Sequence, residues 1–336
     1  MKFYKICLLI LLIAVLFSCV NSRQNVPIER VQYHMGTYAR VQIKGGTNQD
    51  VEAAFKKIKE LDNLLSDYKP DSEISEINNM AGEEAVKVDH QVVKVLEMAK
   101  KVASETDGIF DPTIGALTIG VYRFGRERGE AINIREVDKA KSLVNYRDMI
   151  IKGDNVLLKK KGMMIDLGGI GKGFAVEEAV KVLRGRGVNS GIVSLSGDIK
   201  VFGESVDISI QNPYGEGIVA EFTAGKEDLA ISTSGSYQRF VDLNGKRYHH
   251  LIAPETGRPE GDFLSLTVVT DDSGAMADAY ATALFIMGKD NTIDFISEHK
   301  DIGVFIVFSD GDIYYNKTFS FLVKDLEITD TVLHQN

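Results

Sequence analysis

Hydrophobic residues recur every three or four positions in some stretches of this chain and at every second position in others. The first spacing is typical of amphipathic helices and the second of half-buried strands. A helix that begins with Asp50 as its N-cap and ends near Ser66 would carry an apolar face of Val51, Phe55, Ile58, Leu61 and Leu65. The same spacing predicts helices over residues 89–105, 173–186, 275–287 and 291–299.

Strands are predicted where β-branched and aromatic residues cluster between turn residues. They cover residues 30–44 as a strand pair, 155–159, 163–167, 192–195, 206–210, 229–233, 237–242, 248–252 and 263–270, and a closing hairpin of 304–308 and 313–315. Runs of strands with helices between them favour an α+β fold over a doubly wound parallel sheet, with largely antiparallel or mixed sheets and flanking helices. We expect residues 30–325 to form one domain, followed by a tail over 326–336, because no repeat or linker divides them.

The amino terminus has the pattern of an export signal. Two lysines precede an apolar run over residues 6–17, which is shorter than the roughly 20 residues that a membrane-spanning helix needs. The run ends with a large apolar residue, a second one and a serine before Cys19, as in a bacterial lipoprotein cleavage site. We therefore expect residues 1–18 to be a signal peptide, Cys19 to carry a lipid anchor and residues 19–29 to be a tether. An ordinary secretory signal with a chance cysteine is the alternative.

Charge and cysteine content narrow the range of partners and chemistries. The net charge is −9, and removal of the two signal lysines would make it more negative, so we expect no nucleic-acid partner. The chain has two cysteines, Cys7 in the expected signal and Cys19. The mature protein would therefore keep no free thiol for a disulfide, a metal or a nucleophile.

A glycine-rich turn between a predicted strand and a predicted helix is the most informative motif. It reads Asp166-Leu167-Gly168-Gly169-Ile170-Gly171-Lys172-Gly173. Glycines let the backbone approach a ligand, and the helix amino terminus together with Lys172 would attract an anion. Gly173 stands where a Walker A loop needs Ser or Thr, and Phe174 fills the last position of a G-x-G-x-x-G motif. A strand–helix turn without a ligand is the alternative.

A second candidate site lies on the predicted helix over residues 275–287. Asp278 and Thr282 are four residues apart, so their oxygens share one helix face, and the surrounding residues are small or apolar. Buried oxygens need a partner, and a hard cation such as magnesium suits oxygen ligands. An N-cap aspartate and a threonine bonded to its own helix would explain the same residues.

Two other segments carry candidate groups. His250 follows His249 at the end of a predicted strand and can act as a base near neutral pH, although a histidine on a strand is more often structural. Tyr68 follows the first predicted helix and could stack on a planar ring. A capped turn into a short helix is the alternative for the segment around Tyr68.

Together and in this order, eight segments resemble the ApbE family, the FAD:protein FMN transferases once described as thiamine-biosynthesis lipoproteins. They are Met35-Gly36-Thr37; Ser66-x-Tyr68 with Asp71-Ser72-Glu73-Ile74-Ser75; Gly108-Ile109-Phe110-Asp111-Pro112-Thr113-Ile114-Gly115; Asp166-Leu167-Gly168-Gly169 with Gly171-Lys172-Gly173; Ser196-Gly197-Asp198; Ser232-Thr233-Ser234-Gly235; His250 with Pro254 and Thr256-Gly257; and Ala277-Asp278-Ala279 with Thr282. The resemblance covers nearly all of the expected mature chain.

The resemblance implies an ApbE-like, T-fold-like single domain that binds FAD in a cleft, with magnesium at the pyrophosphate. It implies flavin-nucleotide contacts by Met35, Tyr68, Ile109, Phe110, Asp111, Asp166, Lys172, His250 and Ile252. It also implies metal ligation by the Gly169 carbonyl, Asp278 and Thr282. His250, which would assist the attacking hydroxyl, and Asp278 are the expected catalytic residues.

The implied reaction is a magnesium-dependent transfer of FMN from FAD to a Thr or Ser hydroxyl of a partner protein, with release of AMP. The implied acceptors are membrane electron-transport subunits or exported FMN-binding-domain proteins, which would meet a membrane-anchored enzyme on the extracytoplasmic side. A magnesium-dependent FAD pyrophosphatase and a non-catalytic FAD-binding lipoprotein are the alternatives. The chain departs from the family with Ala253 where Asp is frequent, Gly171 where Ala is frequent, and no tryptophan over residues 117–125.

Overall fold

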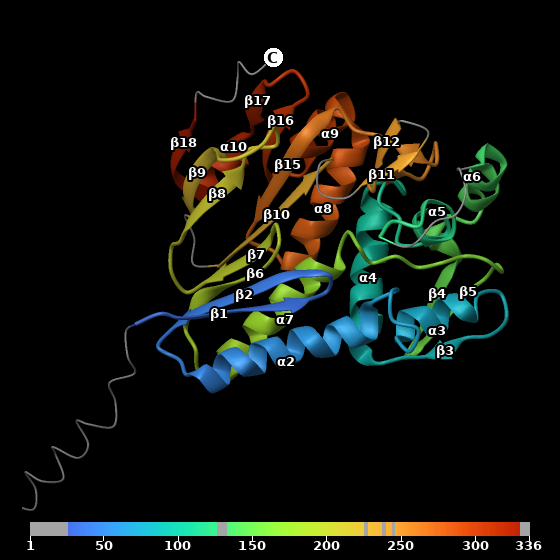
Figure 1. The fold of residues 1–336 in the computed structure, drawn as a ribbon, viewed down its shortest axis with the longest axis horizontal. Helices are drawn as coiled ribbons and strands as arrows, with labels where there is room; N and C mark the ends of the chain where they lie inside the picture. Colours follow the sequence, from blue (N-terminus) through green and yellow to red (C-terminus); the bar gives the residue numbers. More distant parts are fainter. Residues whose placement is uncertain (1–25, 126–132, 225–227, 237–239, 244–245, 330–336) are drawn as a thin grey trace, which may run out of the picture.

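The computed structural model describes residues 26–125, 133–224, 228–236, 240–243 and 246–329 (Figure 1). An eight-stranded sheet forms the centre of the fold, and each pair of neighbouring strands in it is antiparallel. In spatial order the strands are β1 (Ile28–His34), β2 (Thr37–Lys44), β6 (Ser190–Leu195), β7 (Asp198–Phe202), β10 (Asp228–Gly235), β15 (Phe263–Thr270), β16 (Gly303–Phe308) and β17 (Ile313–Tyr315). The prediction of an α+β fold with largely antiparallel sheets is confirmed.

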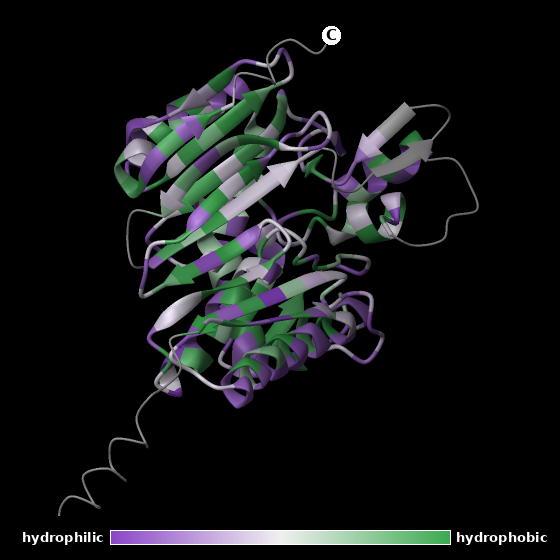
Figure 2. Ribbon diagram, turned by 60° about the vertical axis from the view of Figure 1, so that its left-hand side comes forward, coloured by the Kyte–Doolittle hydropathy of each residue, from purple (hydrophilic) through white to green (hydrophobic). Residues whose placement is uncertain are grey.

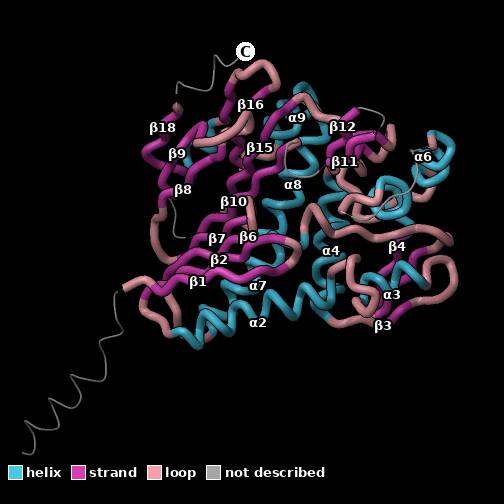
Figure 3. The backbone as a smooth tube through the Cα atoms, in the orientation of Figure 1, coloured by secondary structure: helices cyan, strands magenta, loops and turns pink. Residues whose placement is uncertain are grey.

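Long helices cover one face of this sheet (Figures 1 and 3). They are α2 (Asn48–Leu65), α7 (Gly171–Gly185) and α8 (Gly274–Met287), with α4 (His90–Glu105) packed against α2 and α8. Val41 of β2, Phe55 of α2 and Val180 of α7 belong to one buried cluster between the sheet and the helices. Figure 2 shows that hydrophobic residues follow the strands of the main sheet, which is therefore the wall of the core.

A smaller sheet covers part of the opposite face. Its strands are β8 (Asp207–Gln211), β9 (Ile218–Ala224) and β18 (Val323–Ile328), and α10 (Lys317–Leu322) precedes the last of them. Phe319 of α10 lies with its ring centroid 5.3 Å from that of Phe222 and 5.6 Å from that of Phe305. These rings anchor a second buried cluster between the two sheets.

Shorter elements complete the fold. They are α3 (Glu73–Asn79), β3 (Val86–Lys87), α5 (Gly115–Leu117), the π-helix η1 (Thr118–Tyr122), α6 (Ile134–Lys141), η2 (Tyr146–Asp148), β4 (Met149–Lys152), β5 (Asn155–Leu158), β11 (Phe240–Leu243), β12 (Lys246–His249), β13 (Ile252–Ala253), β14 (Arg258–Pro259) and α9 (Lys289–Glu298). Among the helices in the described residues, none combines the length and the apolar character that crossing a membrane would need.

Several predicted boundaries differ from the structure. Thr47, not Asp50, is the N-cap of α2: its side chain accepts from the Asp50 N–H, and the Asp50 carboxylate accepts from the Thr47 N–H at 2.8 Å. This reciprocal pair is a capping box, so the helix begins closer to the amino terminus than predicted. Helix α7 likewise begins at Gly171, two residues before the predicted start. Strands β1 and β18 extend into the expected tether and tail, to Ile28 and Ile328.

Two of the predicted strands are wrong in detail. Residues 163–167 form only an isolated bridge, because the backbone of Ile165 bonds to the Asn78 side chain of α3 and not to a neighbouring strand. The strand predicted over 248–252 is broken at His250 and Leu251, between β12 and β13. The strand predicted over 237–242 lies partly outside the described residues.

Helices α7 and α8 cross at a pair of glycines. A Cβ atom added to Gly173 would lie 2.1 Å from the Gly274 carbonyl oxygen and 2.6 Å from the Asp278 Cβ. A Cβ added to Gly274 would in turn lie 2.4 Å from the Gly173 carbonyl oxygen. Both helices therefore depend on glycine to approach this closely.

We expect Gly173→Ala to lower the free energy of unfolding by about 1–3 kcal/mol, because the new methyl group must push two backbones apart. Urea denaturation followed by circular dichroism measures this change. Gly185→Ala at the far end of α7 is the matched control, since nothing lies within 4 Å of its Cβ position. That variant should be neutral or more stable by about 0.4–1 kcal/mol. Equal unfolding midpoints for the two variants would contradict the close crossing.

Candidate active site

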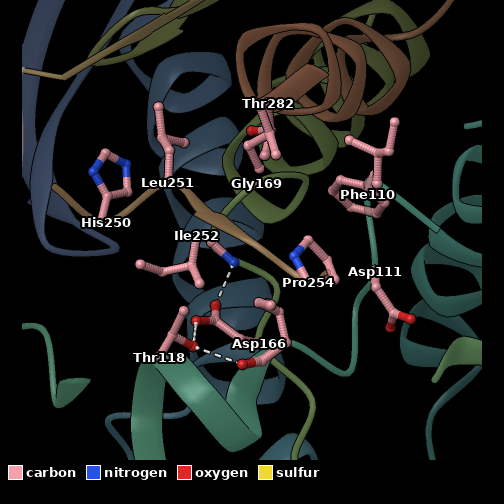
Figure 4. A pocket seen from close by; sticks show the side chains of 14 residues that line it. Phe110, Asp111, Thr118, Asp166, Gly169, His250, Leu251, Ile252, Pro254 and Thr282 are labelled. Atoms are coloured by element: carbon pink, nitrogen blue, oxygen red, sulfur yellow. Dashed lines mark hydrogen bonds between the residues drawn. The ribbon is translucent and has the colours of Figure 1, made fainter. Parts of the chain in front are cut away.

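Two hollows meet at the glycine-rich turn between residues 166 and 172. The first has a volume of about 80 Å³ and the second about 750 Å³, and Gly168 belongs to the walls of both. The predicted residues in the first wall are Ile109, Phe110, Asp111, Asp166, Gly169, His250, Ile252 and Thr282, several of which Figure 4 shows. The predicted residues in the second wall are Met35, Tyr68 and Lys172. Residues far apart in the sequence thus line two adjoining hollows, while Asp278 is buried beneath the turn and Cys19 lies outside the described residues.

Asp166 organises the beginning of the turn. Its Oδ1 accepts the Gly168 N–H at 2.7 Å, and its Oδ2 accepts the hydroxyl of Thr118 at 2.5 Å (Figure 4). Each carboxylate oxygen has capacity for a further hydrogen bond, so Asp166 can also bind a donor within the first hollow. Thr118 was not among the predicted site residues.

Thr118 begins η1, in which hydrogen bonds span five residues and not four. The segment ends at Arg123, whose φ of 54° places it in the left-handed region, and continues to Phe124 in the wall of the second hollow. The Phe124 carbonyl accepts the hydroxyl of Tyr68 at 2.8 Å. Tyr68 is therefore held at the second hollow, and one short segment contributes to both walls.

The start of α7 is stabilised by a side chain from α8. The N-cap Ile170 provides no side-chain hydrogen bond, and the Gly173 N–H instead donates to the Asp278 Oδ2 at 2.9 Å. A carboxylate at a helix amino terminus is favourable because the exposed N–H groups and the helix dipole attract negative charge. The glycine crossing is what allows Asp278 to reach this N–H group.

Asp278 is 3% exposed, and its charge is costly in that environment. Burial raises the pKa of the Asp278 carboxyl to about 7, and the nearby Asp198 adds to the effect, whereas Lys172 opposes it. The Lys172 ammonium lies 3.9 Å from the Asp278 Oδ2. Asp278 is therefore a buried acid that an added cation would favour in its ionised form. The alternative in which it caps its own helix is wrong, because Ser273 is the N-cap of α8.

Gly169 and Thr282 lie in direct contact across the same crossing. A Cβ on Gly169 would lie 2.7 Å from the Thr282 Oγ1, so only glycine lets the turn approach the hydroxyl. Thr282 is the one residue of α8, which the structure describes completely, that is not buried. Backbone carbonyl, hydroxyl and carboxylate oxygens are the donors that magnesium prefers, so Gly169, Thr282 and Asp278 fit such an ion.

The two adjacent histidines have different surroundings. His250 is half-buried in the wall of the first hollow, with its ring edge-on to Phe124 at a centroid distance of 6.5 Å. His249 packs edge-on to Phe285 at 6.0 Å, and burial lowers its pKa. His250 is therefore the histidine that a ligand in the first hollow can meet, because it belongs to that wall and His249 does not.

The carboxylate of Asp111 has a local structural role. Its Oδ1 accepts both the N–H and the hydroxyl of Thr113, at 2.7 and 2.6 Å, and its Oδ2 accepts the Tyr146 N–H at 2.8 Å. These bonds fix the loop that carries Ile109 and Phe110 into the first hollow. The sequence alone did not reveal the bond to Tyr146, which lies 35 positions further along the chain.

Residues 35–306 match the model of the ApbE family. The chain is 26% identical over 333 residues to an FAD:protein FMN transferase of Treponema pallidum, with 92% of each chain covered. It is 28% identical over 314 residues to the enzyme of that name in Escherichia coli K12, covering 87% of this chain and 88% of that one.

Solved structures agree with these sequence matches. The ApbE protein of Thermotoga maritima superposes with a TM-score of 0.81 at 27% identity, over 89% of this chain and all of that one. The flavin transferase ApbE of Vibrio cholerae shares the fold, with a TM-score of 0.78 over 88% of this chain and 99% of that one. On the match over residues 35–306, this chain belongs to the ApbE family.

Proposed function

We propose that this protein is an FAD:protein FMN transferase that depends on magnesium. The observation that carries the proposal is the meeting of two hollows at a glycine-rich turn, beside a buried carboxylate, a hydroxyl and a lysine. FAD has the matching form, with two ring systems joined by a pyrophosphate. Relatives that cover about nine-tenths of the chain bear the name FAD:protein FMN transferase.

Magnesium would be held by the Gly169 carbonyl, Asp278 and Thr282, and it would neutralise charge on the pyrophosphate. The chain's own contribution is a rigid frame around that position. Asp278 is fixed by the Gly173 N–H, and Thr282 is fixed against Gly169 by the helix crossing. Positioning and charge neutralisation are the main contributions that proteins make to phosphoryl transfer.

In the proposed reaction, a Ser or Thr hydroxyl oxygen of the acceptor bonds to the FMN-side phosphorus while the bond from that phosphorus to the bridging oxygen breaks. AMP leaves with the bridging oxygen. His250, which lines the first hollow, would accept the hydroxyl proton. The Lys172 ammonium in the wall of the second hollow would offset negative charge on the phosphates.

We expect Asp278→Asn to reduce FMN transfer by at least about 100-fold, because the amide keeps the side chain's size but loses the charge that holds the ion. The assay incubates the protein with FAD, Mg²⁺ and a flavin-accepting protein, and mass spectrometry detects covalent FMN on the acceptor. Wild-type activity in this variant would contradict the proposed metal site. Free FMN and AMP with an unmodified acceptor, from the wild type, would indicate hydrolysis in place of transfer.

Metal affinity should depend on pH through Asp278. The raised pKa, about 7, means that the metal-free site binds a proton that the ion must displace. The half-saturating Mg²⁺ concentration should therefore be constant well above pH 7 and rise by about tenfold per pH unit below it. Isothermal titration of the wild type with Mg²⁺ between pH 6 and 8.5 measures this dependence. An affinity that is constant over the range would show that Asp278 is already ionised.

We also propose that Cys19 carries the lipid and that the enzyme acts outside the cytoplasm on membrane electron-transport subunits or exported FMN-binding-domain proteins. The support is the sequence pattern before Cys19 and the domain start at Ile28 soon after it. In a bacterial host, labelled palmitate should enter the wild type and be lost in Cys19→Ser. Equal labelling of both, or release of both from membranes by salt, would contradict the anchor.

A further inference from the structure

The ammonium of Lys172 lies between two carboxylates. It forms an ion pair with the Asp198 Oδ2 and lies 3.9 Å from the Asp278 Oδ2. The Lys172 side chain is 22% exposed and lines the second hollow. Asp198 is 2% exposed and, among the described residues, belongs to the wall of neither hollow. A ligand can therefore contact Lys172 directly, whereas Asp198 can act on that ligand only through the lysine.

The sheet fixes Asp198 from two sides. Asp198 begins β7 after the two-residue turn Ser196-Gly197, directly opposite Leu195 of β6. On its other side it lies opposite Ser232 of β10, whose hydroxyl donates to the Asp198 Oδ1 at 2.6 Å. One carboxylate oxygen is thus held by Ser232, which leaves the other directed at Lys172.

We propose that Asp198, oriented by Ser232, is a positioning residue that holds the Lys172 ammonium away from Asp278 and so keeps the Asp278 carboxylate available to a divalent cation. This inference rests on the proposed function, because it concerns the same metal and pyrophosphate position. Without Asp198, Asp278 is the nearer carboxylate for a lysine already 3.9 Å away. The ammonium would then occupy the place of the ion, since both are attracted to the same oxygen.

The test is Asp198→Asn, with Mn²⁺ as the probe and electron paramagnetic resonance as the measurement of free ion. We expect Mn²⁺ to bind about 10-fold more weakly to this variant, the order seen when a group behind a metal ligand is lost. Saturating metal should restore most of the transfer rate, so the change appears in the metal requirement and not in kcat. Unchanged Mn²⁺ affinity would overturn the proposal.

Ser232→Ala is a second variant, which retains every charge and should weaken Mn²⁺ binding in the same direction but less. Asp50→Asn is the matched control: Asp50 is a buried carboxylate paired with Arg186 at 2.7 Å, at the far end of α7. It should lower stability without altering Mn²⁺ affinity. A loss of affinity in Asp50→Asn equal to that in Asp198→Asn would show that the effect is general destabilisation, and would overturn the proposal.

A double-variant cycle separates positioning from simple attraction of the ion by a negative charge. If Asp198 acts through the lysine, Asp198→Asn should have little effect on Mn²⁺ affinity when Lys172→Met is already present. An equal loss of affinity in both backgrounds would assign Asp198 a direct electrostatic role and overturn the positioning role. A wild type that binds Mn²⁺ and FAD but never modifies an acceptor would instead contradict the proposed function, and the cycle could still be completed.

Discussion

The approach of α7 to α8 is the constraint on which the site depends. Only because Gly173 and Gly274 lack side chains can the Gly173 N–H reach the carboxylate of Asp278. The same crossing presses Gly169 against Thr282 and sets Lys172 beside the buried acid. One packing contact between backbones thus brings a carboxylate, a hydroxyl and an ammonium group together.

Burial gives this contact its chemical consequence. An isolated carboxylate in the core is unfavourable, and the hydrogen bond from Gly173 with the nearby Lys172 compensates only part of the cost for Asp278, whose pKa remains raised. Asp278 therefore attracts positive charge, because a nearby cation would relieve the remaining cost of its ionised form. The main sheet is the rigid support for this arrangement, since β7 and β10 hold Asp198 and Ser232 in register on the far side of Lys172.

The sequence predicted the elements whose pattern is local. Helices α2 and α4 have strong 3.6-residue periodicity, and both were predicted to within a few residues. Strand β7 was missed because it has only five residues, and two of them, Asp198 and Lys200, are polar residues of the kind expected in an exposed loop although both are buried. Strand β18 was missed because its residues after Val323 are exposed or half-buried, and their sequence resembles a polar tail.

The resemblance predicted residues for the site and a role for each, but not the bonds that orient them. The structure places Asp166, Lys172 and Thr282 in the walls of the two hollows. The bonds that orient these groups join distant segments: 48 positions separate Thr118 from Asp166, and 105 separate Gly173 from Asp278. No local pattern encodes such a pairing, because each partner is an ordinary residue in its own segment.

The π-helix η1 joins the two hollows and also limits how this part of the chain can change. Thr118 at its start faces one hollow, and Phe124 just beyond its end meets Tyr68 in the other. Loss of one residue from this five-residue turn would shorten the stretch between Thr118 and Phe124. The bond of Thr118 to Asp166 and the bond of Tyr68 to the Phe124 carbonyl could then not both keep their present positions. A substitution in this segment alters one wall at a time, whereas an insertion or deletion would shift one wall relative to the other. The length of the segment is therefore more constrained than its composition.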